Sequence, residues 1–131
     1  MQSTALGARW PVRAMAGIAA GIVIVFVDNF WSAGEVSPIV VVALLLTATF
    51  FAGATWGERG WLAAATTWAC IPLAHVFKHL LGMPDTLHPN TYISMLYLAG
   101  FCLVVSAIGF GLGLLVHRKA GSQRHRASTR L

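Results

Sequence analysis

The chain alternates between long apolar stretches and short polar, glycine- or proline-containing segments. Four apolar stretches, nearly free of charge, cover residues 12–31, 38–56, 61–81 and 91–116. A helix needs roughly 20 such residues to cross the hydrocarbon core of a membrane, since each residue adds about 1.5 Å. The pattern therefore predicts an all-α, polytopic membrane protein, built as an antiparallel four-helix transmembrane bundle. Residues 1–11 then form a short cytoplasmic N-terminal segment, and residues 117–131 form a basic tail that we expect to be disordered.

The boundaries of the apolar stretches carry turn and kink signals. Residues 57–60 predict a tight turn, and residues 82–90, which contain two prolines, predict a loop. Pro72 lies inside the third stretch and lacks a backbone donor, so we expect a kink there. The first stretch follows Arg9 and Arg13, as a secretory signal would, but the bulky and acidic residues after it match a cleavage site poorly. We therefore expect the first helix to be retained.

Composition favours burial in lipid over exposure to water. Of 131 residues, 57% are hydrophobic and 10% are charged, whereas soluble domains carry about 25% charged residues. The net charge of +5 comes from basic residues that flank the apolar stretches, which is typical of a topology signal. We therefore expect the lipid bilayer to be a partner, and we expect no nucleic acid.

The basic residues also predict an orientation. In a four-crossing arrangement every arginine and Lys119 lie on one side of the membrane, and Lys78 lies near the other. Segments rich in lysine and arginine stay in the cytoplasm, so both termini are predicted to be cytoplasmic. The composition, rich in glycine and alanine and with arginine preferred over lysine, suits a multi-pass protein of the plasma membrane, in particular a bacterial inner membrane.

Small residues recur at spacings that bring membrane helices close together. The GxxxG pairs are Gly17 with Gly21, Gly53 with Gly57, and Gly109 with Gly113. Glycine at such positions lets two backbones approach. Two interpretations remain open: packing between helices of this chain, and contact with a partner membrane protein or with a second copy. Cys70 and Cys102 lie deep in apolar stretches and are predicted to be small packing residues. Contact between the two is the alternative, because both fall near the middle of the membrane on stretches joined by a short loop.

Polar side chains gather on the side of the membrane opposite to the basic residues. This outer polar cluster consists of Asp28, His75, Lys78, His79, Asp85, His88 and Tyr97. Ionisable residues within a membrane span are costly and point to function. The alternatives are an interfacial salt bridge, such as Asp28 with Lys78, together with side chains that reach the headgroups, and the polar mouth of a transport pathway.

Histidine spacing raises a third interpretation of the same cluster. His75 and His79, at i and i+4, share a helix face and can bind one metal ion, with His88 or Asp85 from the following loop completing the ligand set. A bis-histidine haem would need a histidine at equal depth on a second helix, and none is available. We expect no cofactor, with a metal ion at His75, His79 and His88 as the alternative.

The basic tail predicts contact with anionic lipid. Its lipid-contact candidates are Arg118, Lys119, Arg124 and Arg126, and each such residue near an anionic leaflet contributes about 1 kcal/mol. Docking to an acidic cytoplasmic partner is the alternative for the same segment.

The sequence contains no nucleophile elbow, phosphate-binding glycine loop or HExxH motif, so we expect no enzymatic activity. The leading hypothesis is a non-catalytic accessory or structural subunit of a membrane assembly. The alternatives are a small homo-oligomeric channel or transporter with a polar outer vestibule, and a histidine-based metal or haem site at the outer face.

Overall fold

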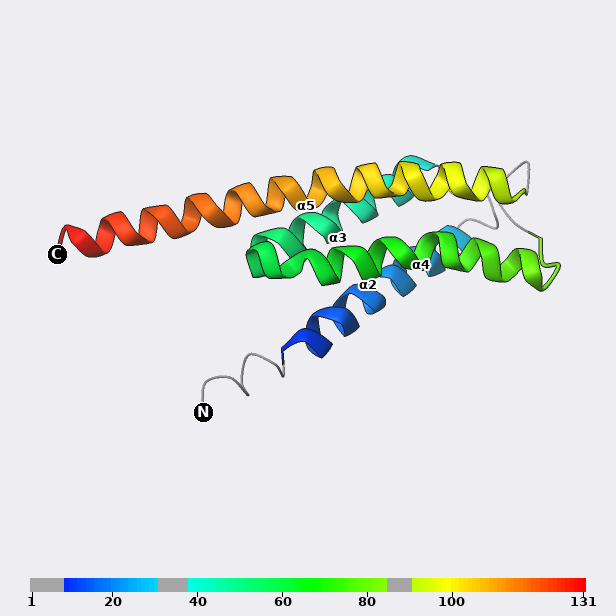
Figure 1. The fold of residues 1–131 in the computed structure, drawn as a ribbon, viewed down its shortest axis with the longest axis horizontal. Helices are drawn as coiled ribbons and strands as arrows, with labels where there is room; N and C mark the ends of the chain where they lie inside the picture. The colour runs from blue at the N-terminus through cyan, green and yellow to red at the C-terminus, as the bar shows by residue number, and fades with distance from the viewer. Residues whose placement is uncertain (1–8, 31–37, 85–90) are drawn as a thin grey trace.

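The computed structural model describes residues 9–30, 38–84 and 91–131, and within these ranges it contains helices and no strand. The elements in order are α2 (Trp10–Phe30), α3 (Pro38–Trp56), the short 3-10 helix η1 (Gly57–Gly60), α4 (Trp61–Leu80) and α5 (Tyr92–Thr129) (Figure 1). The prediction of an all-helical protein is therefore confirmed for the described part of the chain.

Three helical stretches are long and apolar enough to cross a membrane: Trp10–Phe30, Pro38–Leu80 and Tyr92–Thr129. Their outward faces are apolar as well, with Ile39, Leu96 and many other large hydrophobic side chains mostly exposed. An apolar surface of this extent is suited to lipid and not to water. The chain thus has the helices of a multi-pass membrane protein. The second stretch, 43 residues long, is interrupted by η1, which separates α3 from α4.

The turn at η1 brings α3 and α4 back alongside one another (Figure 1). Gly57 has a φ of 59°, a left-handed conformation that glycine adopts without steric cost. Gly60 is buried, and a side chain there would collide with the backbone of Ala52. Gly57 therefore serves the turn. The predicted GxxxG pair also faces α5, since a side chain at Gly53 would collide with the α5 backbone at Phe110 and one at Gly57 would collide with the His117 ring.

The most extensive packing joins helices that run in the same direction. Gly109 of α5 lies against Leu46 and Thr49 of α3, and Gly113 lies one turn further along against Phe50 and Ala54. Positions increase together along both helices, so α3 and α5 are parallel. Successive helices run antiparallel, as predicted, but the closest contacts lie between α3 and α5 and between α2 and α4.

The parallel pair of α2 and α4 uses the other small-residue face. Gly17 lies against Ala63 and Thr66, and Gly21 lies against Cys70. Thr67 Oγ1 donates a hydrogen bond to the Gly17 carbonyl at 3.0 Å, which the missing glycine side chain makes accessible. The GxxxG faces of α2 and α5 are thus occupied within the chain, and self-association through these same faces would have to displace that packing.

The interior changes character along the bundle. Near the end opposite to η1 the core consists of larger side chains, namely Ile24, Leu45, Ile71, Cys102 and Val105. Near η1 it consists of alanines, namely Ala52, Ala63 and Ala64. We call the end that contains η1 the turn end and the opposite end the cluster end. Both cysteines are free thiols.

The basic tail is helical, which contradicts the prediction of disorder. α5 continues without a break to Thr129 and extends well beyond the other helices at the turn end (Figure 1). Its last turns contain alanine, arginine, lysine and glutamine and no proline, residues that favour helix. Extending an existing helix also avoids the cost of nucleation. Composition alone indicated a solvated segment and missed this continuity.

The base of this extension is attached to the turn. Arg118 forms an ion pair with Glu58 at 2.6 Å, and His117 Nδ1 lies 2.9 Å from the Ala54 carbonyl oxygen. The imidazole of His117 also packs over Gly57, where a side chain would collide with it. These contacts fix the direction in which α5 leaves the bundle.

Candidate functional site

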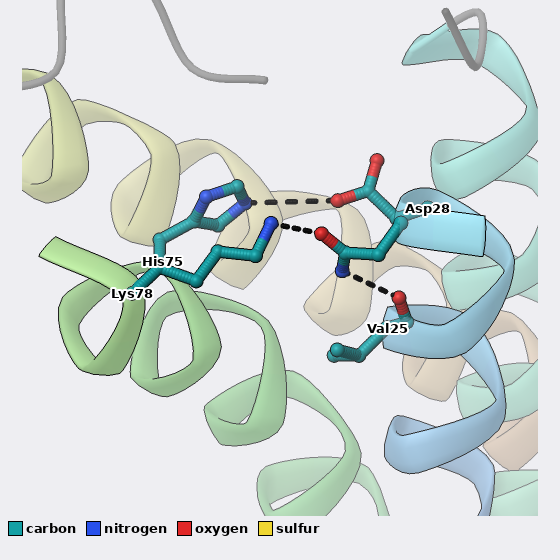
Figure 2. Close-up of polar contacts among 5 residues, drawn as sticks. Val25, Asp28, His75 and Lys78 are labelled. Carbon is teal, nitrogen blue, oxygen red and sulfur yellow. Dashed lines mark hydrogen bonds and ion pairs between the residues drawn. The ribbon is translucent and has the colours of Figure 1, made fainter. Parts of the chain in front are cut away.

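Two parallel helices place a carboxylate and an imidazole opposite each other at the cluster end. His75 Nε2 of α4 lies 3.9 Å from Asp28 Oδ2 of α2, and the two side chains are 8% and 18% exposed (Figure 2). Asp28 lies seven residues beyond Gly21, and His75 five residues beyond Cys70, which packs against that glycine. The close approach of the helices at Gly21 therefore positions the pair.

A second polar contact lies next to the first. Lys78 Nζ donates a hydrogen bond to Asn29 Oδ1, and Asn29 Nδ2 donates to the Val25 carbonyl at 2.6 Å (Figure 2). The structure thus pairs Asp28 with His75 and Lys78 with Asn29. Asn29 directly follows Asp28 in the sequence, which places it at the same end of α2.

A small cavity adjoins these four side chains. It measures about 10 Å³ as space open to the centre of a water molecule, and its apolar wall includes Ile24, Val41 and Ile71. A cavity of this size accommodates about one water, provided that polar partners are present. The carboxylate and imidazole supply such partners. The arrangement can bind one water molecule or share one proton between α2 and α4.

The two histidines of α4 face different neighbours. His75 lies opposite Asp28 of α2, whereas the His79 ring packs edge-on against the Tyr92 ring of α5, with centroids 4.6 Å apart. Across the described ranges no three histidine, cysteine, aspartate or glutamate side chains are grouped so as to hold a metal ion. The loop residues Asp85 and His88, which the metal hypothesis also needs, lie outside the described residues.

Tyr97 is not brought to the cluster. It lies on α5 with 77% of its surface exposed, on the outside of the bundle and away from the Asp28–His75 pair. Among the described residues, Tyr97 and that pair do not line a common vestibule. The sequence placed Tyr97 at the right depth, but depth does not determine which face of a helix a residue occupies.

The predicted lipid-contact residues all lie on the extension of α5 and are exposed; they are Arg118, Lys119, Arg124 and Arg126. Arg118 is engaged by Glu58 of the turn. Lys119 directly follows Arg118, and Arg124 and Arg126 lie about two turns further along the helix.

Two contacts between helices were missed by sequence reasoning. Thr67 bonds the Gly17 carbonyl, and Trp68 Nε1 donates to the Ala99 carbonyl of α5 at 2.9 Å. Both donors reach main-chain acceptors, which every residue supplies, so no side-chain pattern marks them in advance.

Comparison of the chain with protein families, with curated proteins and with solved structures found no match.

Proposed function

We propose that this chain is a non-catalytic subunit of a membrane assembly, which crosses the membrane four times and docks to its partner mainly through α5. The observation that carries this proposal is the single 38-residue helix α5, which joins a lipid-facing stripe of small residues to a basic extension beyond the bundle.

Four crossings account best for the stretch Pro38–Leu80. α3 has 19 residues and α4 has 20, so each reaches about 28–30 Å, the thickness of the hydrocarbon core. One crossing by all 43 residues would need about 65 Å of membrane. The left-handed Gly57 and the buried Gly60 support a reversal at η1 instead.

The charges at the two ends support cytoplasmic termini. Arg9, Arg13, Arg59 and the basic extension of α5 all lie at the turn end, whereas the cluster end contributes Lys78. Basic residues next to membrane spans are retained in the cytoplasm. A bacterial inner membrane remains the location that the composition suits best.

α5 supports docking because two glycines in the bundle part of the helix face open space among the described residues. A side chain at Gly100 or at Gly111 would meet nothing within 4 Å, and Ala107 between them is exposed. These three positions follow steps of seven and four, so they share one face of the helix. Glycine costs about 1 kcal/mol of helix stability relative to alanine, and a closely packed partner helix would account for it.

The basic extension gives the same helix a second contact. Twelve residues separate His117 from Thr129, so the helix reaches about 18 Å beyond the turn. Lys119, Arg126 and Arg130 lie on one face of it, at steps of seven and four. Arg118 and Lys119 are close enough to the bundle to meet anionic headgroups, and the distal arginines suit an acidic cytoplasmic surface of the partner.

The experiment is affinity capture of the full chain from its own membrane, with quantification of co-purifying proteins. Gly100→Leu with Gly111→Leu should abolish co-purification while leaving insertion and folding intact, because both positions are open. Ala43→Leu, at an exposed position on α3, is the matched control and should retain the partner. Equal retention by all variants would contradict docking through this face, and absence of any co-purifying chain from the wild type would contradict the subunit role.

A small transporter is the second candidate function, and the observation in its favour is the Asp28–His75 pair beside a cavity of about 10 Å³. Histidine and aspartate can pass a proton through one bound water. Flux of protons and of common ions into vesicles containing the purified protein tests this role. Flux that Asp28→Asn abolishes would support it, and no flux above that of protein-free vesicles would exclude it.

A further inference from the structure

An apolar groove lies between α2 and α3 in the turn half of the bundle, with α4 as its floor. Its volume is about 500 Å³, and its walls include Ala16 and Ala20 of α2, Ala48 and Phe51 of α3, and Ala63 of α4. It exists because α2 packs closely on α4 and only slightly on α3, and α2 runs obliquely to the other helices (Figure 1). Small side chains on three walls leave the space open.

The groove has the length of one membrane leaflet. On α3 it extends from Ala48 to Trp56, which is eight residues or about 12 Å, close to half of a hydrocarbon core of about 30 Å. Trp56 is at its outer end, at the level where amphipathic rings meet the headgroups. Thr67 is the one polar side chain deep in the groove, and its hydroxyl already donates to the carbonyl oxygens of Gly17 and Ala63. A molecule in the groove therefore needs no polar group at that depth.

Two arginines lie between the groove and the turn end of the bundle, at the level expected for lipid headgroups. Arg9 and Arg13 precede Ala16 and Ala20 at helical steps of four, three and four, so Arg13, Ala16 and Ala20 share one face of α2 and Arg9 lies on the same side in the turn just before the helix. Arg13 Nε is enclosed by protein, and within the described ranges it has no hydrogen-bond partner. An enclosed donor of a charged group that lacks a partner is costly, and a phosphate oxygen is the acceptor that a guanidinium binds best.

We propose that this groove binds one acyl chain of an anionic phospholipid, whose phosphate is bound by Arg13 and whose charge is further balanced by Arg9. The apolar walls of the groove contact the acyl chain, and Arg13 and Arg9 favour an anionic headgroup. α2 of a second copy is a poorer occupant, since a parallel α2 would bring another Arg9 and Arg13 to the same level and add like-charge repulsion. The site depends on insertion in a membrane and not on the partner proposed above.

The test is native mass spectrometry of the delipidated full-length protein in detergent, titrated with phosphatidylglycerol or with phosphatidylcholine. The wild type should retain one phosphatidylglycerol at concentrations at which phosphatidylcholine is not retained. Arg13→Gln should weaken that binding about tenfold, which corresponds to about 1.4 kcal/mol. Arg59→Gln is the matched control, because Arg59 is an exposed arginine at the same end that lies in η1 and not on the face of α2 that carries Ala16 and Ala20. It should change binding by less than twofold.

A variant with a larger side chain in the groove tests whether the groove binds the acyl chain. Ala16 is exposed at the groove, so Ala16→Phe should fill it without disturbing the core and should also lower phosphatidylglycerol binding. Equal effects of Arg13→Gln and Arg59→Gln would overturn the proposal, since binding would then follow net charge alone. Unchanged binding by Ala16→Phe, equal retention of the two lipids, or a dimer that displaces lipid from the wild type would each overturn it as well.

Discussion

Substituting alanine for glycine at neighbouring positions of α5 tests the packing of the bundle. Gly113 lies against the backbone of α3, and a side chain there would collide with the Phe50 carbonyl and approach the Ala54 nitrogen to 2.8 Å. Gly111, two residues away in the same helix, would meet nothing within 4 Å. Gly113→Ala and Gly111→Ala are therefore the same chemical change in two opposite environments.

Two opposing effects determine the magnitude. Alanine favours a helix over glycine by about 1 kcal/mol, whereas overpacking a close contact costs about 1–3 kcal/mol. At Gly113 the neighbouring atoms belong to the backbone and cannot rotate away, so the upper part of that range applies. We expect a net destabilisation of about 2 kcal/mol for Gly113→Ala and a stabilisation of up to about 1 kcal/mol for Gly111→Ala.

Reversible unfolding by sodium dodecyl sulfate in mixed micelles, followed by circular dichroism, measures both free energies of unfolding. The expected difference of about 3 kcal/mol is more than a hundredfold in the unfolding equilibrium. A Gly111→Ala variant that is as destabilised as Gly113→Ala would refute the assignment of α5 faces. Unchanged stability of Gly113→Ala would refute the close contact between α3 and α5.

Three further predictions concern single contacts. Thr67→Val should lower the free energy of unfolding by about 0.6 kcal/mol through the lost bond to α2, while Thr66→Val, whose hydroxyl bonds only its own helix, should change it less; equal losses would exclude the interhelical contribution. Alanine substitutions of Asp28 and His75, made singly and together in the same unfolding assay, should reveal a coupling energy of about 1 kcal/mol, and simple additivity would argue against the pair. Ala120→Pro should abolish the slow hydrogen exchange of the α5 extension without changing bundle stability, because proline breaks a helix interior; an extension that exchanges fast in the wild type would contradict its helicity.

The helical class and the helix positions were predictable because a membrane restricts the solutions. Polar backbone groups must be satisfied within each span, so the uncharged run that ends at Asp28 predicts α2 closely. The turn at 57–60 was predictable as well, because two glycines and two charged residues interrupt the apolar sequence there. The parallel pairing of α3 with α5 was not predictable, because GxxxG marks a face and does not say which helix covers it.

The candidate site was predictable in its members and less so in its contacts. Asp28, His75 and Lys78 were assigned to one end of the bundle from their places along the spans, and the structure brings all three together there. Their partners depend on the rotation of α2 against α4, which Gly21 determines through close packing that a sequence pattern does not specify. The exposure of Tyr97 depends instead on which face α5 turns toward α3, and that packing leaves Tyr97 on the outside.

The subunit role is tested most directly by native mass spectrometry of the full chain, gently extracted from its own membrane with and without Gly100→Leu and Gly111→Leu. The account predicts that the wild type carries one or more different protein chains at a fixed ratio and that the double variant is released from them. A wild type found only as a monomer, or only with copies of itself, would contradict the account.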